Sequence, residues 1–360
     1  MRTVRGLALV CLVPALLASG CMTGQRSTGS GPTPGASTRP ASATPTGPPT
    51  ITVDFAGDVH FTGRTGPLLR HPGTAFGPIA TELASADVSI VNLETAVTTG
   101  GSPQPKTFHF RAPASAYEAV RAAGVDVVTL ANNHAMDYGR VGLTDTLRSA
   151  RAARFPVIGA GRDADEAYQP RYVTVRGVRI AFLGFSQIAE LAPEWLAGGR
   201  TPGIAETFDT RRAVAAVRAA DQKADIVLVY PHWGEEGNEC PIADQRNFAR
   251  AMARAGADAV IGTHAHLLLG SGYLGRTFVG YGLGNFLWWR DDAYSNDTGV
   301  LRLTFTRDRL TGTRFVPAEI SRRTGQPLPA TGAAARRITH KMGHLRRCTG
   351  LSAKPTGSAP

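Results

Sequence analysis

From residue 51 onward the chain repeats one pattern, in which a short apolar run is followed by an amphipathic stretch. The apolar runs are rich in Val and Ile, which is typical of buried strands, and the stretches between them have the apolar spacing of helices. Strands that alternate with helices form parallel βαβ units, so the sequence predicts an α/β fold. The expected strands are 51–55, 88–91, 125–130, 179–184, 226–230, 259–261 and 277–281, and the expected helices are 113–123, 139–153, 209–220 and 242–255.

Two later runs, 298–305 and 311–320, are predicted to form an antiparallel hairpin that extends the sheet. We interpret 51–320 as one domain, because open α/β folds of this size are often single units. Residues 321–360 are interpreted as a basic C-terminal tail. His340 and His344 are four residues apart there, and the many Arg residues around them favour a solvated basic helix over a ligand pair.

Polar residues with ligand-type side chains follow nearly every expected strand. In open α/β sheets, ligands bind outside the carboxyl ends of the strands, because neighbouring loops converge there. Each residue taken singly has an ordinary explanation, such as a helix cap for Asp58 or a core position for His232. The set is nevertheless large, since five of the nine histidines belong to it: Asp58, His60, Glu94, Asn133, His134, His232, His264 and His266.

The chemistry of this set points to a metal centre. Imidazole and oxygen donors without cysteine suit Mn²⁺, Fe or Zn²⁺ rather than a structural thiolate zinc site. The donors exceed what one tetrahedral ion needs, which favours two divalent ions that share a carboxylate. Paired ions activate water and clamp a phosphoryl oxygen. A histidine beside the pair could protonate a leaving group.

The order of these motifs resembles the calcineurin-like metallophosphoesterase superfamily and, more closely, its CapA branch of capsule-synthesis proteins associated with poly-γ-glutamate. The resemblance extends from about residue 51 to about residue 290. It implies a layered α-β-β-α sandwich with mixed sheets. The motifs that carry it are Gly57-Asp58-Val59-His60, Asn92-Leu93-Glu94, Ala131-Asn132-Asn133-His134, Asp137-Tyr138-Gly139, His232-Trp233-Gly234-Glu235, Gly262-Thr263-His264-Ala265-His266 and Gly282-Leu283-Gly284-Asn285-Phe286.

The resemblance also implies a role for each candidate residue. One ion would be held by Asp58, His60 and His266, and the other by Asn133, His232 and His264. Glu94 would bridge the two ions, and His134 would be the acid near the substrate. Arg111 matches a family motif and would bind an anionic group, with a surface salt bridge as the alternative. The superfamily usually supplies its bridging carboxylate as Asp in a Gly-Asp-x-x-Asp motif. Glu94 has a longer side chain, so the resemblance does not determine the distance between the metal ions or whether the protein hydrolyses phosphoesters.

The N-terminal segment predicts export. Arg2 and Arg5 precede an apolar run, Leu7–Leu17, that is too short to span a bilayer, so residues 1–20 are interpreted as a signal peptide. The small residues before Cys21 resemble a lipobox, which predicts a lipid on Cys21 and a location at the outer face of the cell membrane; cleavage by ordinary signal peptidase is the alternative. Residues 21–50 are mostly Gly, Ser, Thr, Pro and Ala, which predicts a disordered tether.

The net charge restricts the classes of molecule that could bind the protein, and the cysteines predict a crosslink within it. The formal charge is +11, and removal of Arg2 and Arg5 leaves 11 − 2 = 9. Scattered basic residues argue against a nucleic-acid site but are compatible with a polyanionic partner, such as an acidic polymer or an anionic membrane surface. The resemblance implies that this polymer is poly-γ-glutamate. In an oxidising compartment, Cys240 and Cys348 are predicted to form a disulfide, with two free thiols as the alternative.

Two functions remain open from the sequence. The first is a lipid-anchored capsule-synthesis or export protein with a dinuclear metal site, which hydrolyses a phosphoester or an anionic polymer. The alternative is a non-catalytic component that binds or anchors poly-γ-glutamate through a vestigial metal site, alongside capsule-synthesis membrane proteins. An extracellular adaptor with a degenerate site ranks last, because the set of ligand-type residues is complete.

Overall fold

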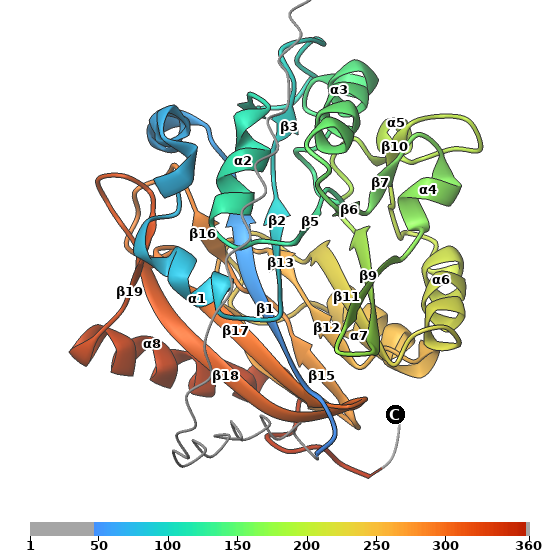
Figure 1. The fold of residues 1–360 in the computed structure, drawn as a ribbon, viewed down its shortest axis with the longest axis vertical. Helices are drawn as coiled ribbons and strands as arrows, with labels where there is room; N and C mark the ends of the chain where they lie inside the picture. Colours follow the sequence, from blue (N-terminus) through green and yellow to red (C-terminus); the bar gives the residue numbers. More distant parts are fainter. Residues whose placement is uncertain (1–46, 358–360) are drawn as a thin grey trace, which may run out of the picture. The chain divides into compact units, whose positions relative to one another are not determined.

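Two mixed β-sheets pack face to face in the computed structural model, which describes residues 47–357 (Figure 1). The predicted signal peptide, Cys21 and nearly all of the predicted tether lie outside the described residues. The first sheet has the order β19-β18-β17-β1-β2-β5-β6, with β16 beside β1. The second has the order β14-β15-β12-β11-β9-β8, with β13 beside β11.

The first sheet is built around β1 (Thr50–Val59), which runs parallel to β2 (Val88–Leu93) and antiparallel to β17 (Asp297–Thr306). The predicted hairpin is β17 with β18 (Arg309–Ile320), so its extension of the sheet is confirmed. The remaining strands are β5 (Val127–Thr129), β6 (Val157–Ile158), β16 (Asn285–Leu287) and β19 (Pro327–Pro329), and a separate small pair is β3 (Ala96–Val97) with β4 (Arg111–Ala112).

The second sheet is built around β11 (Ile226–Trp233), which runs parallel to β9 (Val178–Ser186) and β12 (Ala259–Ile261). The short strand β13 (Thr263–His264) also pairs with β11. The other strands are β8 (Arg171–Val175), β14 (Ser271–Leu274) and β15 (Thr277–Gly280), and a second small pair is β7 (Ala160–Gly161) with β10 (Gly203–Ile204).

Helices cover the outer faces of both sheets (Figure 1). The four predicted helices are present and begin within two residues of the expected starts, as α2 (Ser115–Ala122), α3 (Gly139–Ala152), α6 (Arg211–Asp221) and α7 (Ala243–Ala255). The shorter α1 (Ala80–Ala84), α4 (Ala164–Tyr168) and α5 (Ala192–Trp195) were not expected. A series of 3₁₀ turns in residues 63–79 was also missed, because its Gly and Pro residues break the helical period.

Three hydrophobic clusters define the layers. Alternate residues of β1, among them Ile51, Val53 and Phe55, pack between the sheets against residues of β9 and β11 such as Phe182 and Leu228. A second cluster joins the other face of the first sheet to α1, α2 and α3, and a third joins the second sheet to α4, α6 and α7. The order is therefore helix, sheet, sheet, helix, and the predicted α-β-β-α sandwich with mixed sheets is confirmed.

The C-terminal segment contains α8 (Gly332–Leu345), which lies beside β18 in Figure 1. His340 and His344 are exposed, as expected for a basic helix. The opposite face of the helix is not solvated, because Ile338, Met342 and Leu345 are buried against Leu268. Among residues 47–357, no helix is both long and apolar enough to cross a membrane.

Candidate metal centre

The carboxyl ends of strands from both sheets meet at one edge, and the candidate residues lie there. Asp58 is in β1, opposite Asn285 of β16 and Asn92 of β2. His232 is in β11, opposite Thr263 of β13. Glu94 follows β2, Asn133 and His134 follow β5, and His264 and His266 belong to and follow β13. Parallel strands end at the same edge, which explains how the topology gathers residues distant in sequence.

The segment with His264 and His266 has an unusual backbone. Both residues have positive φ angles, 91° and 57°. Non-glycine residues with positive φ angles are uncommon, and they are concentrated at functional sites. Gly262 is required just before them, because a Cβ there would lie 2.0 Å from Nε1 of Trp233. That nitrogen donates to the Tyr281 carbonyl at 2.8 Å, so the indole is fixed against the glycine.

The first group of donors surrounds His232. Its Nε2 lies 2.9 Å from Asn133 Oδ1, 3.0 Å from His264 Nδ1 and 3.6 Å from Glu94 Oε1. An imidazole nitrogen carries at most one hydrogen, so it cannot donate to all three neighbours. Glu94, His232 and His264 are all buried and offer ligand atoms within 4.8 Å of one another. These residues and Asn133 are the set predicted to share one ion.

A second group consists of Asp58, Glu94 and His266. His266 Nδ1 lies 3.5 Å from Asp58 Oδ2 and 2.8 Å from Asn285 Oδ1. Glu94 is common to both groups, which is the place that a bridging ligand would take. His266 is less buried than His264, with 18% of its side chain exposed.

His60 is not brought into either group. Its ring stacks on Phe110 at 4.1 Å between centroids, and its two nitrogens face backbone N–H groups of Thr62 (3.1 Å) and Trp289 (3.3 Å). A ring held in this way supports the aromatic wall of the site. The role of His60 as a ligand stays a prediction.

The donor chemistry fits divalent cations. Glu94 Oε1 is buried and has no hydrogen-bond partner among the described residues. Burial, with the nearby charge of Asp58 as a smaller cause, raises the pKa of Glu94 well above its usual range, because the ionised carboxylate is poorly stabilised at this place. Burial also lowers the pKa values of His232 and His264 well below the usual range, which keeps their rings neutral with a free lone pair. A cation at this place would satisfy both features.

Two asparagines hold the donors in position. Asn92 Nδ2 donates to Asp58 Oδ1 at 2.8 Å and lies 3.3 Å from Glu94 Oε2 and 3.2 Å from His232 Nδ1. Asn132 Nδ2 in turn donates to Asn92 Oδ1 at 2.9 Å. Asn92 therefore connects residues of both donor groups. Sequence analysis included both asparagines in motifs but assigned them no role.

His134 lies beside the donors and outside both groups. Its Nδ1 is 2.7 Å from Asp137 Oδ2, its ring stacks on Phe110 at 3.9 Å, and its Nε2 lies 3.8 Å from Glu94 Oε1. Asp137 also accepts from the Phe110 backbone N–H at 2.6 Å. Burial raises the pKa of Asp137 to about 6, with Lys106 opposing, so the carboxylate is ionised at pH 7 and holds a proton on Nδ1.

Lys106 completes this chain of contacts. Its side chain is 2% exposed, and its Nζ lies 3.0 Å from Asp137 Oδ1 and 2.7 Å from Glu190 Oε2. Neither Lys106 nor Asp137 was among the functional residues predicted from the sequence. Asp137 had a signal, because it stands three residues after His134, whereas nothing near Lys106 in sequence marks it.

A cavity of about 350 Å³ opens beside the centre, with His134 and His266 in its lining. Arg111 is not among the lining residues. Its guanidinium donates to the Gly100 carbonyl at 3.2 Å and lies 3.4 Å from the centroid of the Tyr138 ring. The cation that does line the cavity is Arg290, which sequence analysis did not single out.

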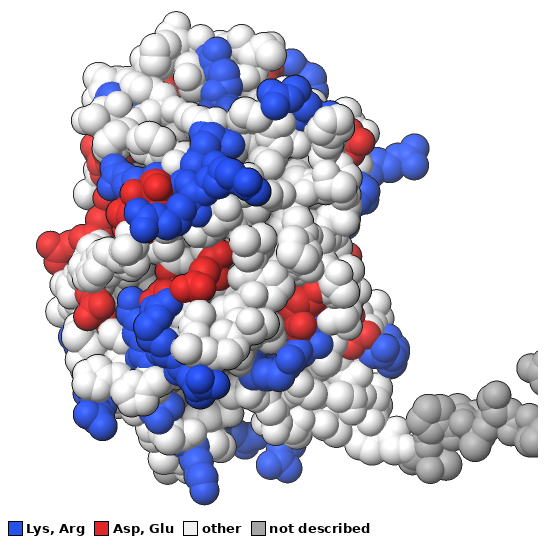
Figure 2. All heavy atoms as spheres, turned by 90° about the vertical axis from the view of Figure 1, so that its left-hand side faces the viewer, with Lys and Arg blue, Asp and Glu red and all other residues white. Residues whose placement is uncertain are grey.

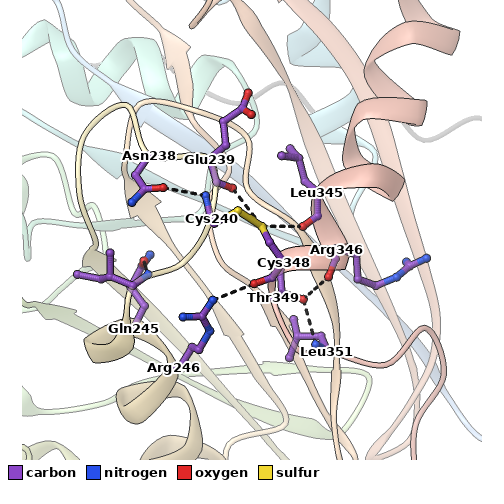
Figure 3. Close-up of a disulfide and its surroundings, with 11 residues drawn as sticks. Asn238, Glu239, Cys240, Gln245, Arg246, Leu345, Arg346, Cys348, Thr349 and Leu351 are labelled. Atoms are coloured by element: carbon purple, nitrogen blue, oxygen red, sulfur yellow. Dashed lines mark hydrogen bonds between the residues drawn. A yellow bond between two sulfur atoms is a disulfide. The ribbon is translucent and has the colours of Figure 1, made fainter.

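One wall of the cavity belongs to the loop between β11 and α7, through Glu236 and Gly237. A disulfide joins Cys240, at the end of this loop, to Cys348, with an S–S distance of 2.10 Å (Figure 3). Arg246 of α7 donates to the Cys348 carbonyl at 2.8 Å. The C-terminal segment is thus attached to the loop that borders the cavity.

Basic residues do not form one continuous surface on the face seen in Figure 2. Lys and Arg side chains occur there in several groups, with Asp and Glu between them. This distribution agrees with the scattered charge in the sequence.

The comparisons with known proteins place the chain in a family. A family model described as "Bacterial capsule synthesis protein PGA_cap" matches residues 52–288. The chain belongs to this family. The matched segment contains all the donors of the centre, from Asp58 to His266. The CapA resemblance predicted from the motifs is therefore confirmed.

Curated relatives agree with the family. The PGA biosynthesis protein CapA of Bacillus subtilis is 31% identical over 224 residues, which are 62% of this chain and 58% of that protein. The capsule biosynthesis protein CapA of Bacillus anthracis is 29% identical over 292 residues, 79% of this chain and 70% of that one. A probable polyglutamine synthesis accessory protein of Mycobacterium tuberculosis is 34% identical over 195 residues, 51% of each chain.

Solved structures with a similar arrangement include NAD nucleotidase from Haemophilus influenzae, at 14% identity and a TM-score of 0.47 over 86% of this chain and 65% of that one. A hypothetical protein from Thermus thermophilus has 20% identity and a TM-score of 0.46, over 75% of this chain and 99% of that one. The fold assignment rests on the four layers described above rather than on these likenesses.

Proposed function

We propose that this protein is a metal-dependent hydrolase of capsule synthesis, which cleaves an anionic polymer of the poly-γ-glutamate kind or a phosphoester at the edge where the two sheets meet. The observation that carries the proposal is Glu94. Its Oε1 atom is buried without a hydrogen-bond partner among the described residues and lies between two groups of donor atoms that share this carboxylate. Without a cation at this place, the buried carboxylate would destabilise the folded protein. A bound cation would offset that cost.

The residues divide the work in this proposal. Asn133, His232 and His264 would hold one divalent ion, Asp58 and His266 the other, and Glu94 both. His60 stays a predicted ligand, although its nitrogens face backbone groups in this structure. Such ions, when bound, supply Lewis acidity and an activated water. The identity of the metal is proposed as Mn, Fe or Zn from the mixture of imidazole and oxygen donors.

His134 is the proposed acid. Asp137 keeps a proton on Nδ1, so Nε2 is the nitrogen that faces the centre. Burial lowers the pKa of His134 well below its usual range, so the resting ring is neutral and Nε2 first accepts a proton. That second proton is the one that the ring passes to a leaving oxygen or nitrogen. The stacked Phe110 ring fixes the imidazole plane and excludes water from one face. The buried position of His134 also makes any interaction with a developing negative charge stronger than it would be in water.

The experiment is metal analysis joined to turnover. We expect elemental analysis of the purified protein to give about two ions per chain, and chelation to abolish hydrolysis of poly-γ-glutamate or of a phosphodiester until Mn²⁺ or Zn²⁺ is restored. Stoichiometric metal without turnover of any such substrate would leave the non-catalytic alternative, in which the protein binds or anchors the polymer. The net positive charge favours that alternative, and salt-sensitive polymer binding that survives chelation would support it.

We also propose that the protein works outside the cell membrane, anchored by a lipid on Cys21, in contact with membrane proteins of capsule synthesis. The support is the sequence of the first 50 residues. Mass spectrometry of the mature N-terminus tests it, since a diacylglyceryl-modified Cys21 is expected and a chain that begins at another residue contradicts it.

A further inference from the structure

The cavity beside the metal centre has a buried end and an exposed end. The buried end includes His134, which is 5% exposed. The exposed end includes Phe108 and Tyr294, which are 44% and 53% exposed, together with Trp289 and Arg290. The Phe108 and Trp289 rings are adjacent, so they form a continuous apolar surface at the mouth of the cavity, and a surface of that kind marks contact with a ligand more than a single exposed ring does.

Arg290 lies on the aromatic side chains of this mouth. Its guanidinium carbon is 5.6 Å from the centroid of the Phe108 ring and 5.6 Å from that of Trp289, and the two rings are 6.1 Å apart. A guanidinium that is positioned by aromatic rings keeps N–H donors available for a planar anion. The ring contacts therefore orient Arg290 without using its hydrogen-bonding capacity.

Neighbouring arginines, in contrast, are already engaged. Arg322 is paired with Asp291 at 2.8 Å, and Arg64 donates to the backbone carbonyls of Arg290 and Arg322. Among residues 47–357, the Arg290 side chain has neither a carboxylate partner nor a hydrogen bond. It is thus the cation of the cavity that remains free to bind a ligand.

The two acidic residues of the cavity restrict where an anion can bind. Asp292 accepts the Ser295 backbone N–H at 2.7 Å, and Glu236 Oε1 lies 3.8 Å from His266 Nε2, on the side of the metal centre. Both repel an anionic group from their own positions. A carboxylate that enters the mouth is therefore directed to Arg290 rather than held anywhere along the wall.

We propose that Arg290, supported by Phe108 and Trp289, binds a carboxylate of the substrate at the mouth of the cavity. The ligand class is a chain that carries a carboxylate beside a run of methylene groups, as each repeat of poly-γ-glutamate does. The methylenes pack on the aromatic faces, and the carboxylate pairs with the guanidinium. The inference rests on the proposed function in placing the substrate in this cavity, and it names the residue that selects the substrate.

The test measures binding without turnover. A γ-linked glutamyl pentapeptide and its analogue with every free carboxylate converted to a carboxamide are titrated into the purified protein by calorimetry. We expect the acidic peptide to bind the unmodified protein at least tenfold more tightly than the amide. Arg290→Gln should remove that preference and change amide binding less than twofold, and Arg290→Lys should retain part of it.

The matched control is Arg323→Gln, which removes the same charge from an exposed arginine outside the lining of the cavity. It should change the affinity for the acidic peptide less than twofold. Equal losses in Arg290→Gln and Arg323→Gln, equal binding of the two peptides, or no binding of the acidic peptide would each overturn the inference.

Failure of the proposed function gives a different pattern. The protein could prefer the acidic peptide through Arg290 and yet contain no metal and turn over no substrate. That result would support the role of Arg290 and contradict the proposed hydrolase activity. Metal-dependent turnover with the same kcat/KM for both peptides, unchanged in Arg290→Gln, would leave the hydrolase standing and remove the inference.

Discussion

Two regions of this molecule each bury a glutamate that has an unpartnered oxygen, and they differ in what surrounds it. Glu94 is fully buried among Asp58, His232 and other donors. Glu206, beside β10, is 3% exposed, and neither of its carboxyl oxygens has a hydrogen-bond partner among the described residues. Around Glu94, several carboxylate oxygens and imidazole nitrogens lie close enough together to bind one cation. The Glu206 carboxyl belongs to no such group of donors within residues 47–357, and burial keeps it protonated instead.

The pKa values shift in the same direction in both regions, so they do not separate the two glutamates. Burial raises the pKa of Glu206 to about 8. Burial also raises the pKa of Glu94, and the charge of Asp58 adds to it. A buried acid alone is therefore weak evidence for a site, whereas a buried acid among other metal donors is strong evidence.

The largest effect is expected from Glu94→Gln. The amide keeps the volume but removes the negative charge shared by both donor groups, so metal content should fall from about two ions per chain to near zero. Turnover should fall to the level of the chelated unmodified protein, because the Lewis acid and the activated water are lost together. Glu206→Gln is the matched control, with metal content and turnover unchanged. Equal metal content in both variants would show that Glu94 is not a ligand.

The next effect separates the two halves of the centre. His264→Ala should remove the ion that this residue shares with Asn133 and His232. His266→Ala should remove the ion that this residue shares with Asp58. Each variant should therefore keep about one ion per chain in elemental analysis. His266→Ala should also change KM, because that ring lines the cavity. Loss of both ions in each variant would instead indicate a single interdependent cluster.

His134→Asn is expected to lower turnover by roughly 10²-fold, the usual contribution of a general acid, while metal content stays the same. Asp137→Asn should have a smaller effect in the same direction, because it only orients the ring. The measurement is kcat together with metal analysis on the same sample. A His134→Asn protein that loses its ions would make His134 a ligand.

Glu206→Gln is expected to act on stability alone. Because the folded-state pKa of about 8 exceeds the ordinary value of 4.5, the folded protein binds more protons than the unfolded chain between these values. The contribution of Glu206 to stability is complete below the unfolded pKa and is lost as pH rises through about 8. Between pH 5 and pH 8 the variant should gain at most about 4 kcal/mol relative to the unmodified protein.

Denaturant unfolding at both pH values measures this gain. A difference between variant and unmodified protein that is the same at pH 5 and pH 8 would mean that Glu206 titrates normally. It would also weaken the contrast with Glu94, since Glu206 would then not be a carboxyl whose pKa is shifted by burial.

The sequence by itself determined the fold class, the order of the main elements and the residues that lie at the strand ends. The reason is local, because alternating apolar runs specify strands, helical spacing specifies helices, and parallel strands all end at one edge. The motifs added the family. Asp58, Glu94, Asn133, His232, His264 and His266 could be named in this way because each follows or ends a strand.

Only the tertiary structure decided which of these side chains face one another and what supports them. His60 follows its strand as the others do, yet its ring stacks on Phe110, which comes from a distant loop in the sequence. Lys106 and Arg290 carry no local pattern, and their positions beside Asp137 and at the cavity mouth arise from loop packing. Strand periodicity fixes a residue's place on an edge, but side-chain direction and burial depend on contacts between distant segments.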